Sequence, residues 1–371
     1  MIPFAPKITQ SNTFSRNPNH PIFNFIAHHK SSPKSPKIPS KMAACIDTPR
    51  RTEAKEQTQD QERSKFPKYP RSTYSDRISC VPFSQNREKS FLAGSIDVGV
   101  EEEDVWSKMV EEAKLDVEQE PILLNYYYNS ILSHKGLEFA LASHLSMKLG
   151  CSVLPNSALF ELFVGVLEDD EKIIEAVKDD LRAVRDRDAA CTSYVHCFLN
   201  FKGFLACQAH RISHKLWSKG RKPLALLLQS RVSEVFAVDI HPGARIGRGI
   251  LLDHATGLVI GETAVIGNNV SILHNVTLGG TGKDCGDRHP KIGDGVLIGA
   301  GTCVLGNVIV GDGAKVGAGS VVLKPVPART TAVGNPARLI GGKENPIILD
   351  KIPSFTMDHT SHIDEWSDYV I

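Results

Sequence analysis

The sequence predicts an α+β protein with an all-helical domain over residues 101–236, a parallel β-helix over residues 237–342 and an extended C-terminal tail over residues 343–371. Three observations support this fold class. Apolar residues of the first region recur at three- and four-residue spacings, the period of a helix. An aliphatic residue then recurs at every sixth position, and beyond Gly342 this repeat is lost.

Composition limits the kinds of protein the chain can be. Its 371 residues, 41% of them hydrophobic, suffice for two domains. The net charge of +1 argues against a nucleic acid or an anionic membrane as partner, and no apolar run reaches membrane-spanning length. The eight cysteines form no CxxC pair, so we expect free thiols and no metal site.

The first 46 residues resemble an organelle transit peptide in composition. They contain six Lys or Arg, six Ser and seven Pro but no Asp or Glu. Scarce Arg and the lack of a clear amphipathic helix favour the plastid over the mitochondrion, and a form starting at Met42 could stay in the cytosol. A disordered basic tail is the alternative. Residues 47–100 are Pro-rich, charged and aperiodic, which predicts a flexible linker.

The helical domain is predicted from four segments with helical spacing, residues 104–117, 137–150, 171–184 and 204–217. Gly150 ends the second segment in the manner of a helix C-cap. His210 and His214 are four residues apart and could share a metal, but HRISH lacks the Glu of HExxH and no third ligand is evident. A position in or at the edge of the core is the favoured reading of these histidines.

The six-residue repeat predicts the β-helix, because each hexad can supply one short strand and a turn and three hexads close one coil. Glycine suits the turns because it accepts positive φ. All fourteen repeat positions are Ile, Leu or Val: Ile240, Ile246, Leu252, Leu258, Ile260, Ile266, Ile272, Leu278, Ile292, Ile298, Val304, Val310, Val316 and Val322.

The repeat slips twice, within LLDHATGLVIGE and around GGTGKDCGDRHP. Insertions leave a solenoid as loops on one face, which is often the binding face. The slips place Asp253, His254, Arg288 and His289 at these interruptions, so we take them as candidate functional residues.

The motifs LDHATG, IHPGA and GDRHP, with YVHCFLNFKGFLACQAHRI before the repeats and GNPARLIGG after them, closely resemble serine O-acetyltransferase of the hexapeptide-repeat acyltransferases. The resemblance covers about residues 101–342. It implies a left-handed β-helix, a homotrimer with sites between subunits and a dimer of trimers. The amino-terminal extension and the end SHIDEWSDYVI are similar to plant organellar members.

The resemblance implies direct acetyl transfer from acetyl-CoA to L-serine, the committed step of cysteine biosynthesis, with no tightly bound cofactor. Such a transfer needs a base near neutral pH, and histidine has an intrinsic pKa of about 6.5. By the resemblance, His254 is this general base and Asp239 orients it. Asp239 lies fifteen residues earlier, close to one coil.

The resemblance also assigns the substrate site. Asp188 and Asp253 would bind the ammonium of serine, and Arg288 with His289 its carboxylate. Ala189 follows Asp188 where the family usually has Pro. The family's backbone conformation at this turn is therefore not carried over to this chain. Cysteine shares both charged groups and is implied as a feedback inhibitor. We assign structural roles to His241, His274 and Glu262.

The same resemblance implies where acetyl-CoA binds. GGTGK lacks the spacing of a phosphate loop, and its family role is in CoA binding. Small residues would let the pantetheine arm lie against the coils, with Lys315 near phosphate. The implied set is Gly280, Thr281, Ala300, Gly301, Lys315 and Ala318, although a turn-forming role explains the glycines equally well.

The tail ends in an aromatic and aliphatic sequence with a free carboxylate, which suits capture by a partner's site. In the resembling family this end enters the active site of O-acetylserine sulfhydrylase. Tyr369, Val370 and Ile371 are therefore the expected contacts.

Three other functions stay open: a hexapeptide acyltransferase with another hydroxyl or amine acceptor, a catalytically dead scaffold that binds a partner through its tail, and a zinc hydratase with three convergent histidines.

Overall fold

The computed structural model describes residues 104–282 and 285–360, which belong to one compact unit. The predicted transit peptide, the linker and the last residues Tyr369, Val370 and Ile371 lie outside the described residues. Of the predicted tail, residues 343–360 are described.

The helical domain is confirmed. Its elements are α1 (Val105–Gln119), η1 (Pro121–Leu123), α2 (Leu124–Tyr127), η2 (Tyr128–Leu132), α3 (Leu137–Leu149), α4 (Asn156–Glu168), α5 (Glu171–Arg187), α6 (Tyr194–Asn200), α7 (Lys202–Ser218) and α8 (Lys222–Phe236). Side chains set several helix starts: Asp104 accepts hydrogen bonds from the backbone N–H groups of Trp106 and Ser107, and Asp170 accepts one from Lys172. Gly150 is the C-cap of α3, as predicted.

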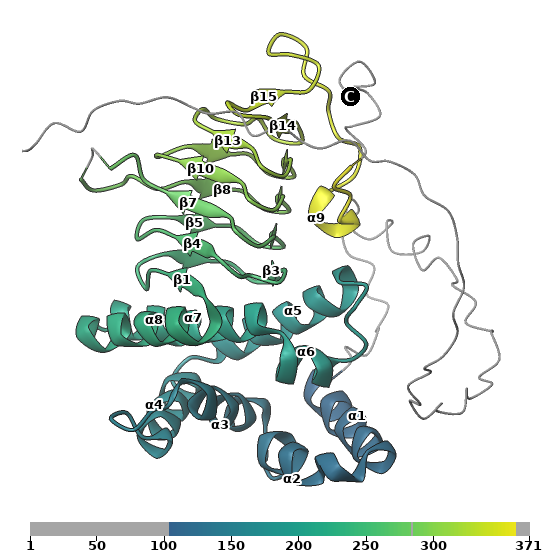
Figure 1. Cartoon of the computed structure of the whole chain (residues 1–371), viewed down its shortest axis with the longest axis vertical. Helices are drawn as coiled ribbons and strands as arrows, with labels where there is room; N and C mark the ends of the chain where they lie inside the picture. The colour runs from purple at the N-terminus through teal and green to yellow at the C-terminus, as the bar shows by residue number, and fades with distance from the viewer. Residues whose placement is uncertain (1–103, 283–284, 361–371) are drawn as a thin grey trace, which may run out of the picture. The chain divides into compact units, whose positions relative to one another are not determined.

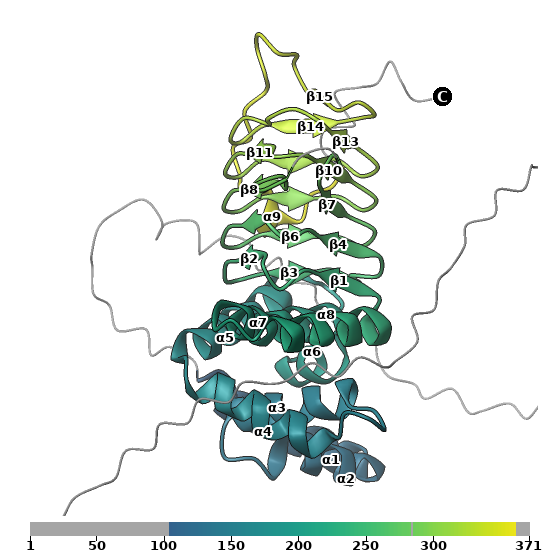
Figure 2. The same cartoon turned by 90° about the vertical axis from the view of Figure 1, so that its left-hand side faces the viewer.

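The β-helix is also confirmed, and its three faces are three sheets of stacked parallel strands (Figures 1 and 2). The first sheet contains β1 (Val238–Ile240), β4 (Leu258–Ile260), β7 (Thr277–Gly279), β10 (Cys303–Leu305) and β13 (Val321–Val322). The second contains β2 (Arg245–Ile246), β5 (Val265–Ile266), β8 (Lys291–Ile292) and β11 (Ile309–Val310). The third contains β3 (Leu251–Leu252), β6 (Ser271–Ile272), β9 (Leu297–Ile298), β12 (Lys315–Val316), β14 (Thr331–Val333) and the antiparallel β15 (Arg338–Leu339).

The repeat positions fill the solenoid core. Every one of the fourteen lies in a strand, and all except Ile246 are buried. In β1 the neighbours of Asp239 point inward, since Val238 is 0% and Ile240 3% exposed. Asp239 therefore lies on the outer side of the first sheet, because successive side chains of a strand point to opposite faces.

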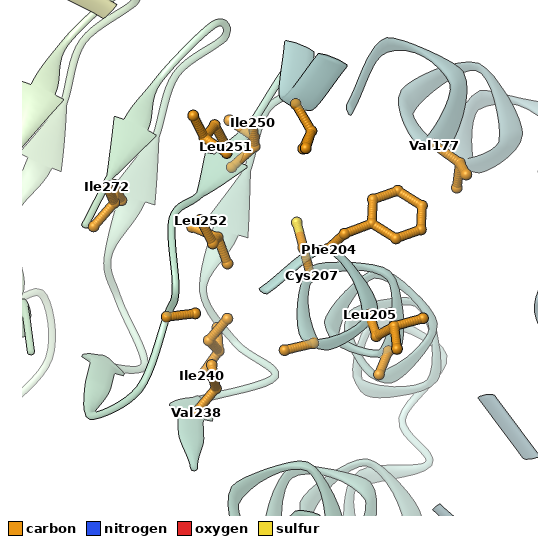
Figure 3. Packing of buried hydrophobic residues seen from close by; sticks show 14 of the residues in the cluster. Val177, Phe204, Leu205, Cys207, Val238, Ile240, Ile250, Leu251, Leu252 and Ile272 are labelled. Atoms are coloured by element: carbon orange, nitrogen blue, oxygen red, sulfur yellow. The ribbon is translucent and has the colours of Figure 1, made fainter. Parts of the chain in front are cut away.

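The helical domain packs on the first coil through α5, α7 and α8. Figure 3 shows Cys207 of α7 pointing toward Leu252, whereas the ring of Phe204 points toward Val177 of α5; all four belong to one buried cluster. Gly203 permits this close approach, since a Cβ there would lie 2.0 Å from the carbonyl oxygen of Leu252. The start of α7 consequently lies directly against the chain that leads into the LDHATG turn.

Residues beyond β15 return along the third sheet and include the short helix α9 (Pro353–Thr356). The Arg329 guanidinium donates to the carbonyl oxygens of Leu349 and Asp350, and the Ser354 hydroxyl lies 2.8 Å from that of Ser271 in β6. Arg187 donates to the Ser354 hydroxyl at 3.1 Å. The described part of the predicted tail is therefore bound to the solenoid and to α5. None of the described helices is long and apolar enough to cross a membrane.

Candidate active site

Two corners of the solenoid carry most of the predicted site residues. The histidine corner joins the third sheet to the first and comprises residues 253–257, 273–276, 299–302 and 317–320. The arginine corner joins the first sheet to the second and, among the described residues, comprises 241–244, 261–264, 280–282, 285–290 and 306–308. The two slips of the repeat fall one on each corner, as loops, as the sequence predicted.

The LDHATG turn presents His254 to solvent. His254 and Ala255 both adopt positive φ, 54° and 52°, so the turn points the imidazole away from the coil. The side chain of His254 is 77% exposed, and its Nε2 lies 3.9 Å from Oδ1 of Asp253. Its ring centre is 5.9 Å from that of His274, on the next coil. An exposed imidazole beside a carboxylate can accept a proton from a ligand hydroxyl.

Three of the residues predicted for CoA stack above His274 on the same corner. The backbone N–H of Gly301 donates to the carbonyl oxygen of His274 at 3.0 Å, and that of Gly319 to Ala300 at 2.8 Å. Gly299 lies under Ala318, where an added Cβ would be 2.5 Å from the Ala318 nitrogen. The predicted one-coil stacking of Ala300 and Ala318 is therefore present, and it forms a column of small residues that starts beside His254.

Asp239 lies on the outer face between the two corners, in register with Val259 of β4. Its Oδ1 accepts a hydrogen bond of 2.6 Å from Nε2 of Gln229 in α8. An open cleft there is lined by both residues together with Leu226, Ser230, Ser233 and Glu234. In this single chain the carboxylate of Asp239 binds Gln229 and not His254. The predicted contact, in which Asp239 orients the His254 imidazole, stays a prediction.

On the arginine corner, Arg288 and His289 are held by the coil below them. Nη2 of Arg288 donates to Oε2 of Glu262 at 2.8 Å, and this bond lowers the pKa of the Glu262 carboxyl. Nδ1 of His289 lies 2.9 Å from the Thr263 hydroxyl. Burial lowers the pKa of His289, which favours the neutral imidazole at neutral pH.

Gly280 and Thr281 lie on the arginine corner, apart from the other residues predicted for CoA. A Cβ on Gly280 would lie 3.5 Å from Cγ of Arg288, and the methyl group of Thr281 is close to Gly306. A second open cleft beside this corner is lined by Trp217, Gly243, Arg245, Glu262, Thr263, Ala264 and Asp287.

Asp188 is the C-cap residue of α5, and its Oδ1 accepts a hydrogen bond from the N–H of Ala190 at 2.8 Å. The turn thus forms with Ala189 in the place where the family usually has Pro. The preceding Arg187 donates to Gly249 and Asn269 of the first two coils. Arg187 thus binds the turns that lead into β3 and β6, whereas Asp253 follows the other end of β3.

Lys315 of β12 is 2% exposed and lies under the returning C-terminal segment. Its ammonium donates to the carbonyl oxygen of Asp358 at 3.1 Å and lies 3.7 Å from the Asp358 carboxylate. A phosphate contact at Lys315 would require Asp358 to move. Burial lowers the pKa of His359, and the nearby Asp253 carboxylate opposes this shift.

One chain does not bring all the predicted residues together. His254 and Asp253 lie on the histidine corner and Arg288 and His289 on the arginine corner, at opposite ends of the strands of the first sheet. Among the described residues, no group of three or more His, Cys, Asp or Glu is arranged to hold a metal ion.

Sequence reasoning gave Glu262 a structural role but did not pair the residues that hold the site in place. Gln229 binds Asp239, Glu262 binds Arg288 and Thr263 binds His289. Glu262 and Thr263 lie 26 residues before their partners, so no local motif connects them. The second slip of the repeat, around GGTGKDCGDRHP, was the only sequence signal that could have paired them.

Comparison with known proteins identifies the family. A family model described as "Serine acetyltransferase, N-terminal" matches residues 105–209, and one described as "Bacterial transferase hexapeptide (six repeats)" matches residues 289–324. Arabidopsis thaliana serine acetyltransferase 1, chloroplastic, is 64% identical over 336 residues, which cover 89% of this chain and 100% of that protein. Arabidopsis thaliana serine acetyltransferase 3, mitochondrial, is 61% identical over 341 residues, covering 89% and 86%.

Solved structures agree with this assignment. Soybean serine acetyltransferase complexed with serine is 64% identical and superposes with a TM-score of 0.63, over 64% of this chain and 97% of that one. A Brucella abortus serine acetyltransferase in complex with coenzyme A is 48% identical, with a TM-score of 0.63 over 64% and 96% of the two chains. The chain belongs to the serine acetyltransferase family and is an acyltransferase.

Proposed function

We propose that this enzyme transfers the acetyl group of acetyl-CoA to L-serine, giving O-acetyl-L-serine and CoA, the committed step of cysteine biosynthesis. A bond forms between the serine hydroxyl oxygen and the acetyl carbon, and the thioester C–S bond breaks. The observation that carries the proposal is the exposed His254 beside Asp253 at the LDHATG turn, at the foot of a column of small residues. The relatives named for serine acetylation support the choice of acceptor.

His254 is the general base in this proposal. It takes the hydroxyl proton as the oxygen attacks the thioester carbonyl, and it returns that proton to the leaving thiolate. Because the substrate hydroxyl is itself the nucleophile, no acyl-enzyme is formed. Asp239 orients the imidazole in the assembled enzyme.

The substrate groups are divided between two sets of charges. Asp188 and Asp253 bind the ammonium of serine, and Arg288 with His289 binds its carboxylate. Because these pairs lie on different corners of one chain, a site formed between neighbouring subunits of a homotrimer completes the set. A dimer of trimers is the proposed assembly.

Acetyl-CoA is a co-substrate, and no tightly bound cofactor is proposed. Its pantetheine arm lies along Ala300, Gly301 and Ala318, with Gly280 and Thr281 contributed from the arginine corner. Lys315 approaches phosphate once Asp358 is displaced. The coenzyme A complex of the Brucella abortus relative supports a CoA site on this fold.

Regulation and assembly complete the proposal. Cysteine competes with serine, in line with a serine acetyltransferase structure described as a complex with cysteine, 48% identical to this chain. The C-terminal residues Tyr369, Val370 and Ile371 bind O-acetylserine sulfhydrylase in a cysteine synthase complex. Residues 1–46 direct import into the plastid, with the mitochondrion second, as the chloroplastic and mitochondrial relatives make plausible.

The acceptor is tested by measuring thiol release from acetyl-CoA with serine, threonine, homoserine and a sugar as alternatives. Serine should support the highest kcat/KM. A higher value for another acceptor would select the alternative acyltransferase, and no release with any of them would select the catalytically inactive scaffold.

A fluorescent fusion to the first hundred residues tests import, and a cytosolic signal would reject it.

A further inference from the structure

The arginine corner contains a threonine to which no role in the reaction has been assigned. Thr263 lies on the turn after β4, one residue beyond Glu262, and lines the cleft beside Arg288. Its hydroxyl oxygen accepts hydrogen bonds from the backbone N–H groups of Arg288, at 3.0 Å, and of His289, at 3.1 Å. One side chain thereby fixes the backbone of two successive residues that bind the substrate carboxylate in the proposed function.

Thr263 also determines which nitrogen of His289 carries hydrogen. The backbone N–H of Thr263 donates to Nδ1 of His289 at 3.1 Å. A nitrogen that accepts a hydrogen bond has no hydrogen of its own, so the ring hydrogen is on Nε2. The Thr263 hydroxyl lies 2.9 Å from the same Nδ1.

The imidazole is held neutral by its surroundings. Protonation of Nδ1 would place its hydrogen against the Thr263 N–H. Burial and the positive charges of Arg288 and Lys291 lower the pKa of His289, and Glu262 opposes them; His241 is the remaining titratable neighbour and also lowers it.

His289 is 7% exposed, so a ligand can reach only a small part of its ring. Among the described residues Nε2 of His289 makes no hydrogen bond, and it faces Gly261. A Cβ on Gly261 would lie 2.0 Å from Cδ2 and 2.1 Å from Nε2 of His289, so only glycine leaves room for the ring in this position.

We infer that Thr263 is a positioning residue for substrate recognition, which presents His289 as a neutral Nε2–H donor beside the guanidinium of Arg288. The carboxylate of serine or cysteine is then bound by one charged donor, the guanidinium of Arg288, and one neutral donor, the imidazole of His289. Because His289 is already neutral, its contact with the carboxylate requires no change of protonation near pH 7. This inference rests on the proposed function.

The positioning role is tested with Thr263→Val, which keeps the shape and removes the hydroxyl, and with Thr263→Ser, which restores it. Thr263→Val should raise the KM for serine and the inhibition constant of cysteine in parallel, each roughly tenfold, the scale of one lost hydrogen bond to a charged or buried group. The KM for acetyl-CoA should stay within about twofold, and Thr263→Ser should return both constants to near the wild-type values. Gly261→Ala, which displaces the His289 ring without touching the hydroxyl, should raise the same two constants.

Side-chain ¹⁵N spectra of the full-length enzyme labelled at histidine, assigned with His289→Gln, test the tautomer. His289 should show the neutral Nε2–H pattern at pH 7. A charged ring or an Nδ1–H pattern would overturn the inference, and so would wild-type serine and cysteine constants in folded Thr263→Val. These spectra do not depend on turnover, so a correct tautomer in an enzyme that does not acetylate serine would reject the proposed function alone.

Discussion

Asp180 of α5 and Arg211 of α7 form a buried ion pair, with 2.7 Å between Oδ2 and Nη2. The same guanidinium nitrogen donates to the carbonyl oxygen of Gly247, and the second carboxylate oxygen of Asp180 accepts from the N–H of Ile250. Each of the two side chains therefore binds the other helix and also the backbone of the first coil. This pair links α5 and α7 to the first coil of the solenoid.

We expect Asp180→Asn to lower the free energy of unfolding by about 3–5 kcal/mol, because it leaves the Arg211 charge buried without its counterion. Urea unfolding at fixed protein concentration measures this loss. Asp179→Asn is the matched control: its carboxylate pairs with Arg182 at the surface, at 3.2 Å and 29% exposure, and should contribute less than about 1 kcal/mol. Equal losses for the two variants would show that the buried pair has no special role.

His254→Ala should lower kcat at least ~100-fold, the usual scale for loss of a general base. Asp239→Asn should lower it less, because the base itself remains. Thiol release by variants that elute at the wild-type size on gel filtration provides the measurement. Near-normal turnover of correctly assembled His254→Ala would refute the proposed mechanism.

Arg288→Ala should raise the KM for serine strongly and weaken cysteine inhibition in parallel, since both ligands present the same carboxylate. The KM for acetyl-CoA should change little. Calorimetric titration with each ligand separates these effects. If the affinities for serine and cysteine were unchanged, Arg288 would have a structural role with Glu262 instead.

The helical domain should lose stability in mild acid. Burial lowers the pKa of His144 to about 4, below the 6.5 of an exposed imidazole. Between these values the unfolded chain binds the proton and the folded chain does not, so stability is full above pH 6.5 and falls as the pH drops toward 4. Each pH unit in this window costs up to about 1.4 kcal/mol for this group. Thermal unfolding of His144→Leu should show a shallower fall than the wild type; identical slopes would exclude His144 as the cause.

Removal of Ile371 should abolish binding to O-acetylserine sulfhydrylase and leave the acetyltransferase folded and active. In the proposed complex this residue is the main anchor, because it combines an apolar side chain with the terminal carboxylate. Calorimetry and size-exclusion chromatography of the mixed proteins provide the measurement. A truncated chain that still forms the complex would place the interface elsewhere.

The sequence alone determined the architecture of the solenoid. Its strands are short and repeat one hydrogen-bonding register, so the aliphatic residue of each hexad must enter the core wherever that hexad falls. Positions such as Ile272 and Val304 could therefore be predicted as buried without knowledge of the rest of the fold. The loops at Asp253 and Arg288 were equally predictable, because an insertion into a fixed register has to leave the coil.

Only the tertiary structure decided which residues hold the functional groups. Thr263 meets His289 and Glu262 meets Arg288 because a loop inserted into the arginine corner returns above the preceding coil, 26 residues later. Lys315 is covered by Asp358 because the chain reverses beyond β15 and descends the third sheet. No periodic pattern encodes these contacts, since they depend on where irregular segments return to the solenoid rather than on the repeat itself.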